Sequence, residues 1–147
     1  MRAAAQRYLA LSPTKQKAVQ VGLCERALAV WEAHFARSVA VVYRESVTGT
    51  TQELEIRLPR EALACVRSGQ DIANLESRYR EPLTALQDHD LDFPDQVEMA
   101  YYAIRNAFAS HVLKREVDPW LVVNQALAAI GEADPVQVLE EILDGEA

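Results

Sequence analysis

The chain has 147 residues, of which 50% are hydrophobic and 25% are charged, and its formal net charge is −7. This composition is typical of one soluble globular domain and excludes a disordered or low-complexity chain. No stretch approaches the roughly 20 consecutive apolar residues that a membrane span needs, and the N-terminus lacks the cleavage pattern of a signal peptide. The sequence therefore predicts a cytoplasmic protein that folds as a single helical domain over residues 1–147.

The N-terminal part of the chain predicts two helices. Residues 2–11 are rich in alanine and form the first of them. Ser12 is an N-cap residue and Pro13 suits the first helical position, so a second helix begins there. The apolar residues of this second helix keep helical spacing: Val19, Leu23, Ala27, Val30, Trp31 and Phe35.

Residues 39–58 fit two structures. Apolar residues alternate with polar ones on both sides of a turn at residues 48–50, as they do in a β-hairpin. However, the helical spacing of the preceding segment also continues to Val39 and Val42. Because an isolated hairpin is marginally stable unless it packs on helices, we favour a helix followed by an extended connection, with the hairpin as the alternative.

Turn and cap residues divide the next segment. Pro59 starts a short helix that ends at Gly69. Asp71 caps the following helix, whose apolar residues begin at Ile72. Pro82 ends or kinks that helix, because proline lacks the N–H that the helical hydrogen bond requires.

Residues 92–115 carry a helical pattern of about five turns, and we interpret them as the central helix. One stripe of apolar residues recurs at steps of three or four: Val97, Tyr101, Ile104, Phe108 and Val112. Two further helices start at Asp118-Pro119 and Asp134-Pro135, and the first of these ends at Gly131. The predicted fold class is therefore mainly α, a helical bundle of six or seven helices.

Charge is distributed unevenly along the chain. Residues 1–44 hold seven Lys and Arg against two Glu, whereas residues 81–147 hold three against fourteen Asp and Glu. An acidic half repels phosphates, so we expect no nucleic-acid partner. It attracts a basic protein. A solvated acidic surface that only keeps the protein soluble is the alternative.

Four aspartates lie close together in the segment before the central helix, which we call the acidic loop: Asp88, Asp90, Asp92 and Asp95. An EF-hand calcium loop needs Gly at its sixth position and an acidic residue at its twelfth. Those positions hold Phe93 and Met99, so the pattern excludes an EF-hand, although a looser Mg²⁺ or Ca²⁺ site is an alternative. Capping of the central helix explains two of the aspartates, and we expect no metal site.

The other polar residues predict no cofactor and no catalytic group. His34, His89 and His111 are scattered, while Cys24 and Cys65 lie in apolar helical patterns, as reduced core thiols do. Neither a nucleophile elbow nor a phosphate-binding loop is present.

Two groups of polar residues predict contacts between elements. Arg78 or Arg80 is expected to pair with the acidic loop and to fix its position. Asn106, Asn124 and Gln125 lie inside apolar patterns, and buried amides need hydrogen-bond partners. These amides therefore either join helices or lie at the edge of the core and face water.

Short motifs in the second half of the chain share a resemblance: Arg78-Tyr79 with Glu81-Pro82, Asp90-Leu91 with Phe93-Pro94, Tyr101-Tyr102-Ala103-Ile104 with Asn106, and Trp120-Leu121-Val122-Val123-Asn124-Gln125-Ala126-Leu127. Together, over residues 76–128, they resemble small bacterial immunity proteins of polymorphic-toxin systems, whose toxins are secreted or contact-dependent. The resemblance implies a non-enzymatic protein that binds and neutralises one cognate toxin inside the producing cell. It carries over no residue roles, because these families block their toxins in different ways.

We combine the charge and the resemblance into one leading hypothesis, in which the acidic half binds a basic toxin domain. The predicted contact residues are Asp88, Asp90, Asp92, Asp95, Glu98 and Tyr102. The alternative is a helical adaptor or homo-oligomeric module with apolar contacts, and a homodimer would then form through Val138 and Ile142. A third hypothesis is an enzyme with a metal ion held by the acidic loop.

Overall fold

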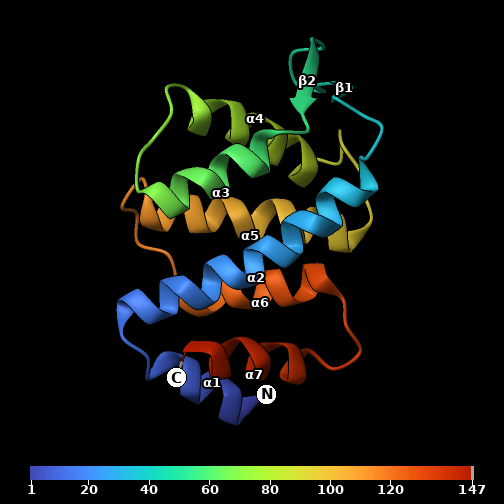
Figure 1. The fold of residues 1–147 in the computed structure, drawn as a ribbon. Coiled ribbons are helices and arrows are strands. Elements are labelled where there is room, and N and C mark those ends of the chain that lie inside the picture. The colour runs from blue at the N-terminus through green and yellow to red at the C-terminus, as the bar shows by residue number, and fades with distance from the viewer. Residues whose placement is uncertain (147) are drawn as a thin grey trace.

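Helices make up most of the computed structural model, which describes residues 1–146 (Figure 1). Seven helices and one two-stranded antiparallel sheet occur in this part of the chain. In chain order the elements are α1 (Arg2–Leu9), α2 (Pro13–His34), β1 (Ala40–Arg44), β2 (Thr51–Glu55), α3 (Leu58–Ser68), α4 (Leu75–Gln87), α5 (Asp95–His111), α6 (Pro119–Ile130) and α7 (Pro135–Glu146). The fold is mainly α, as the sequence predicts.

The helices stack in layers, and α5 lies at the centre. Figure 1 shows α1 and α7 at one end, then α2 with α6, then α5 with α3, and finally α4 with the hairpin at the opposite end. Helix α5 contacts α2, α3, α4 and α6. Its predicted apolar stripe is buried from Val97 to Phe108, which confirms its central position. Three alanines on its flanks are fully buried and let neighbouring helices approach closely: Ala100, Ala103 and Ala107.

Several helix ends follow the predicted cap residues. The Ser12 hydroxyl accepts a hydrogen bond from the Lys15 N–H at 3.3 Å, and Pro13 is the first residue of α2. Asp118 caps α6 in the same way through the Trp120 N–H. Gly69 and Gly131 end α3 and α6 in the left-handed conformation, with φ of 74° and 69°, a region that glycine enters without steric cost.

Helix α4 differs from the prediction at its start. Asp71 does not cap it, because its carboxylate accepts from the adjacent Ile72 N–H at 2.7 Å and the helix begins only at Leu75, four residues after Asp71. Asn74 precedes the helix in the left-handed region, with φ of 66°, which asparagine tolerates better than most residues. Pro82 does not end the helix, which continues to Gln87.

Residues 39–58 contain a hairpin, so the favoured helix with an extended connection is wrong. Strands β1 and β2 pair in the register Val41 with Leu54 and Tyr43 with Gln52. The hairpin is stable here because its inner face packs on the helices: Leu54 is fully buried, and the Trp31 Nε1 donates to the Ile56 carbonyl at 3.0 Å. Pairing therefore depends on a tryptophan that lies 25 residues away in the sequence.

The apolar face of α7 is used within the chain. Val138 is buried, and a Cβ added to Gly22 would lie 3.3 Å from the Ile142 Cδ1, so α2 and α7 are in close contact. Of the two residues named for a homodimer, Ile142 therefore packs against α2, and Val138 is part of the apolar core. Cys24 and Cys65 are buried free cysteines in the same apolar interior. Among residues 1–146, no helix has the length and apolar character to cross a membrane.

Candidate functional site

The acidic loop, residues 88–94 together with Asp95 at the start of α5, is held in place by apolar side chains. Leu91 is buried, and the Phe93 ring lies 5.1 Å from that of Phe35 in an edge-to-face arrangement. His89 has φ of 62°, which turns the chain away from the end of α4. With its apolar residues facing inward, the loop leaves Asp88 and Asp92 exposed to solvent.

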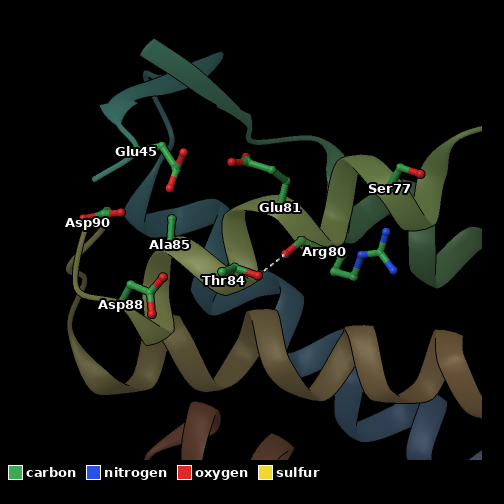
Figure 2. A pocket seen from close by; sticks show the side chains of 8 residues that line it. All are labelled: Glu45, Ser77, Arg80, Glu81, Thr84, Ala85, Asp88 and Asp90. Atoms are coloured by element: carbon green, nitrogen blue, oxygen red, sulfur yellow. Dashed lines mark hydrogen bonds between the residues drawn. The ribbon is translucent and has the colours of Figure 1, made fainter. Parts of the chain in front are cut away.

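An open pocket of about 290 Å³ lies between the hairpin turn, α4 and the acidic loop. Figure 2 shows carboxylates from all three segments on its walls. The lining residues are Glu45, Ser77, Arg80, Glu81, Thr84, Ala85, Asp88 and Asp90. We call this the acidic pocket. It brings together residues that lie far apart in the sequence.

Hydrogen bonds fix two of the carboxylates at the hairpin turn. Asp90 accepts from the Ser46 N–H at 2.9 Å and from the Ser46 hydroxyl at 3.0 Å, which ties the acidic loop to the turn. Glu45 accepts from the Thr48 hydroxyl and from the N–H groups of Val47 and Thr48. These bonds favour the charged form and lower the pKa of Glu45, with the Thr48 hydroxyl as the largest cause.

The other two carboxylates are held differently. The Tyr43 hydroxyl donates to Glu81, and burial followed by this bond raises the pKa of Tyr43, so the phenol keeps its proton. The side chain of Asp88 is exposed and makes no hydrogen bond within residues 1–146. Asp88 is therefore the carboxylate that an incoming cation reaches with the least rearrangement.

The acidic pocket carries excess negative charge. It contains four carboxylates and one cationic side chain, that of Arg80. Arg80 forms no ion pair with any described residue, whereas Arg78 binds Glu55 at 2.6 Å and Glu61 at 3.4 Å. The predicted pairing of Arg78 or Arg80 with the acidic loop is therefore wrong for Arg78, which β2 and α3 hold instead, and Arg80 lines the pocket without neutralising one carboxylate directly.

The predicted contact residues divide into separate groups. Asp88 and Asp90 line the acidic pocket, while Asp92 and Asp95 are exposed near the start of α5 and do not line it. Glu98 is half-buried and accepts from the Phe93 N–H at 3.3 Å, so it stabilises the end of the loop. Glu45 and Glu81 were not predicted as site residues, because nothing in the local sequence places either of them beside the aspartates.

Tyr102 lines a different cavity, of about 310 Å³, between α4, α5 and α6. Burial, followed by the nearby charge of Glu98, raises its pKa. In the same cavity the Asn106 Nδ2 donates to the Gln125 Oε1 at 2.7 Å, so these half-buried amides join α5 to α6, one of the two arrangements expected of them. Asn124, by contrast, is exposed.

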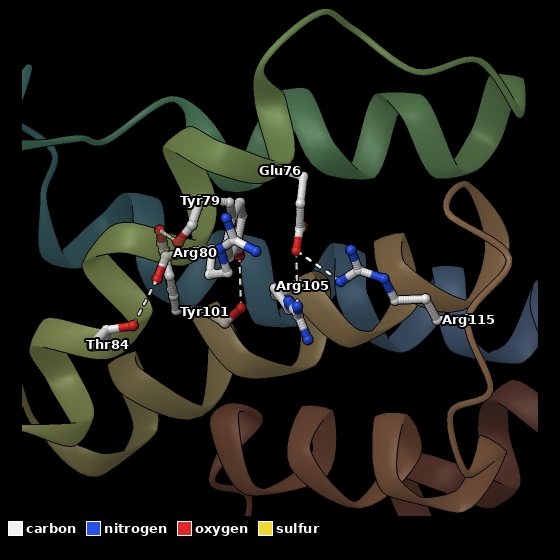
Figure 3. Close-up of polar contacts among 7 residues, drawn as sticks. All are labelled: Glu76, Tyr79, Arg80, Thr84, Tyr101, Arg105 and Arg115. Atoms are coloured by element: carbon white, nitrogen blue, oxygen red, sulfur yellow. Dashed lines mark hydrogen bonds and ion pairs between the residues drawn. The ribbon is translucent and has the colours of Figure 1, made fainter.

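Buried polar contacts set the position of α4, which forms one wall of the acidic pocket (Figure 3). The Tyr79 hydroxyl donates to the Tyr101 carbonyl at 2.6 Å, and the Tyr101 hydroxyl donates to the Tyr79 carbonyl at 2.8 Å. Glu76 accepts from Arg105 and from Arg115, each at 2.9 Å. These bonds join α4 to α5 and to the segment after it, so we assign them a structural role.

No family model matches the chain, and neither a curated protein nor a solved structure does. Among residues 1–146, no group of three or more His, Cys, Asp and Glu side chains is arranged to hold a metal ion. The acidic pocket is therefore described by its own charge, its hydrogen bonds and its open shape.

Proposed function

We propose that this protein binds a basic protein partner by accepting one of its lysine or arginine side chains in the acidic pocket. The observation that supports this proposal is the convergence of four carboxylates from three chain segments on one open pocket with a single arginine. Opposite charges within a few ångströms attract strongly where solvent is partly excluded. A pocket with this balance favours a cation over a neutral or anionic group.

The net charge of the whole molecule also favours a basic partner. Its net charge is −7, and the negative excess comes from residues 81–147, which hold three Lys and Arg against fourteen Asp and Glu. A surface of one sign raises the association rate of an oppositely charged partner, and salt reduces this effect. The acidic pocket then provides a specific contact within a surface that attracts the partner from a distance.

We infer the class of partner from the resemblance of residues 76–128 to immunity proteins of polymorphic-toxin systems. On this proposal the protein is not an enzyme, and it neutralises a cognate toxin domain by covering a basic surface. An enzyme that grips phosphates needs such a basic surface, so a toxin of this type presents lysine and arginine side chains that the acidic pocket accepts.

The test is a paired charge substitution in the acidic pocket. Thr84→Lys with Asp88→Lys adds three positive charges to the pocket without removing a carboxylate that holds the hairpin turn. The matched control, Ala128→Lys with Glu140→Lys, adds the same charge at exposed positions of α6 and α7. Both variants are first compared with the wild type by circular dichroism and thermal unfolding, to show that the fold is kept.

The wild type serves as bait in lysate of the source organism at about 50 mM and about 500 mM salt, where screening differs strongly. A basic protein retained only at the lower salt concentration is then purified, and its association rate is measured. We expect the pocket variant to lower that rate by at least about tenfold and the control to change it much less. Equal rates for the two variants, or a partner that is not basic, would refute the proposal.

A further inference from the structure

The hairpin presents two open strand edges. The pairs Val39 with Ile56 and Glu45 with Thr50 are joined by backbone hydrogen bonds of 3.0 and 2.9 Å. Because bonded and non-bonded pairs alternate in an antiparallel ladder, the backbone N–H and C=O groups of every second residue point away from the partner strand. These residues are Ala40, Val42 and Arg44 on β1, and Thr51, Glu53 and Glu55 on β2. Within residues 1–146, no further strand pairs with either edge.

The two edges differ in their side chains. The β2 edge carries Glu53 and Glu55, and charged residues of this kind protect an edge from pairing with other strands. The β1 edge has Val42 at its centre, whose side chain is 65% exposed, and the adjacent Val39 is 79% exposed. Its only charged residue is Arg44. The β1 edge is therefore the less protected one.

The open part of the β1 edge is short and symmetric about Val42. Beyond Arg44, the next outward N–H is that of Ser46, and it donates to the Asp90 carboxylate at 2.9 Å. Asp90 thus closes the edge at this end. Of the three outward residues, Ala40 lies on one side of Val42 and Arg44 lies on the other.

We propose that the β1 edge pairs in antiparallel fashion with the β1 edge of a second copy of this chain, about a two-fold axis at Val42. The pairing forms a four-stranded sheet in which Val42 lies opposite Val42 of the second copy and Ala40 lies opposite Arg44. No like charges face each other. The same pairing through β2 would set Glu53 opposite Glu53, which is unfavourable.

Charge complementarity at the ends of the pairing supports a second copy as the occupant. In the four-stranded sheet, Arg44 of the second copy lies opposite the small side chain of Ala40, and the next residue along the same row is Glu55. Arg44 is exposed and forms no ion pair with any described residue. The hairpin lies at one end of the molecule in Figure 1, so the two helical bodies, each with net negative charge, extend away from the shared sheet.

This pairing does not rest on the proposed function, because it uses backbone groups of β1 and no toxin partner. The interface is small, so we expect a weak dimer that is populated only at high concentration. Backbone amide exchange is measured by NMR at about 20 µM and about 1 mM, two concentrations that bracket the dissociation constants expected of a weak dimer. At the higher concentration, exchange slows at the amides of Ala40, Val42 and Arg44 and stays unchanged at Thr51, Glu53 and Glu55. Sedimentation velocity reports the accompanying dimer.

Proline substitutions provide a matched pair of variants. Val42→Pro removes an outward N–H that the hairpin does not use, and proline is tolerated at such edge positions. We expect it to weaken self-association by at least about tenfold, whereas Glu53→Pro removes the equivalent N–H from the other edge and leaves self-association intact. Val42→Lys, which sets two ammonium groups opposite each other, has the same expected effect if Val42→Pro does not fold.

Three outcomes would overturn the proposal. The first is a monomeric wild type at about 1 mM, a concentration at which even weak association is detectable. The second is slowed exchange at the β2 amides, with growth beyond a dimer, because that pattern indicates open-ended pairing of β1 with β2. The third is equal loss of self-association in the Val42→Lys and Glu53→Pro variants.

Discussion

At the scale of single residues, Gln20 is a buried polar side chain, and its hydrogen bonds determine which atom of each neighbouring group donates and which accepts. Its Nε2 donates to the Tyr8 hydroxyl at 2.8 Å, and that hydroxyl donates to the Pro119 carbonyl at 3.2 Å. The Gln20 Oε1 lies 2.7 Å from the His111 Nε2. Because an amide oxygen only accepts, the His111 Nε2 carries the proton in this bond. Four segments of the chain are joined through one glutamine.

The protonation of His111 predicts a loss of stability at mildly acidic pH. Burial lowers the pKa of His111 below its ordinary value of 6.5, and the charges of Lys17 and Lys114 lower it further. The unfolded chain therefore binds a proton more readily than the folded chain. The free energy of unfolding falls as pH decreases from 6.5 toward the lowered pKa, and it becomes constant with respect to this group below that value.

Urea denaturation at intervals from about pH 7 downward measures this effect, because the unfolded chain begins to protonate near the ordinary histidine pKa of 6.5 and the folded chain only below it. In His111→Gln, whose side-chain amide can still donate to Gln20, the slope over this window should decrease. His34→Gln changes an exposed histidine and serves as the control. An unchanged slope in His111→Gln would contradict the assignment. Glu45, whose pKa is lowered, contributes in a separate window below its ordinary pKa of 4.5.

At the scale of elements, the hairpin depends on its contact with the helices. Leu54 is fully buried in the core, whereas the adjacent Glu53 is exposed on the other face of the strand. We expect Leu54→Ala to lower the free energy of unfolding by about 2–5 kcal/mol, the range for a leucine truncated in a packed core. Urea denaturation measures the change.

Glu53→Ala is the control for this prediction, because it alters the same strand at a surface position. It should change the free energy of unfolding by no more than about 0.5 kcal/mol. Similar effects of the two substitutions would show that strand pairing, rather than burial of Leu54, holds the hairpin on the body.

Helix boundaries could be predicted from the sequence where a local cap decides them. Ser12, Asp118 and Gly131 act within a few residues of the helix that they begin or end, and all three predictions are confirmed. The hairpin could not be decided in this way, because Trp31 and the helices beneath Leu54 supply its stability. Tertiary packing of this kind leaves no signal in the strand residues themselves.

At the scale of the whole molecule, one connected apolar core includes buried residues of every helix and of both strands among the described elements. Ion pairs join distant parts of its surface: Arg7 of α1 lies 3.0 Å from Asp144 of α7, and Arg26 of α2 lies 3.8 Å from Glu141 of α7. The basic first part of the chain and the acidic last part therefore become neighbours in the fold.

A single core predicts one cooperative unfolding transition. Trp31 is fully buried near Phe35 and Tyr101, while Trp120 is partly exposed and lies 6.0 Å from Tyr8 at the other end of the stack. The fluorescence of the two tryptophans and the far-UV circular dichroism should change at the same urea concentration. An earlier transition of Trp120 fluorescence in a Trp31→Phe variant would show that α1 separates first.

The candidate site was only partly predictable because it forms at this scale. Asp88 and Asp90 were identified from the density of carboxylates in one short segment. Glu45 reaches the same pocket only after the hairpin folds back on α4, and the bond that ties the two parts together, from Ser46 to Asp90, spans 44 residues. A cluster of carboxylates that is contiguous in the chain can be predicted from the sequence, whereas one that folding assembles cannot.

The buried cysteines allow transient opening of the fold to be measured chemically. Burial raises the pKa of the Cys24 thiol to about 12, and thiol-directed reagents react with the thiolate. A closed molecule therefore resists alkylation at neutral pH, while an opened one is marked permanently. The rate at which iodoacetamide alkylates Cys24 therefore measures how often a chain exposes its interior, and no engineered label is needed.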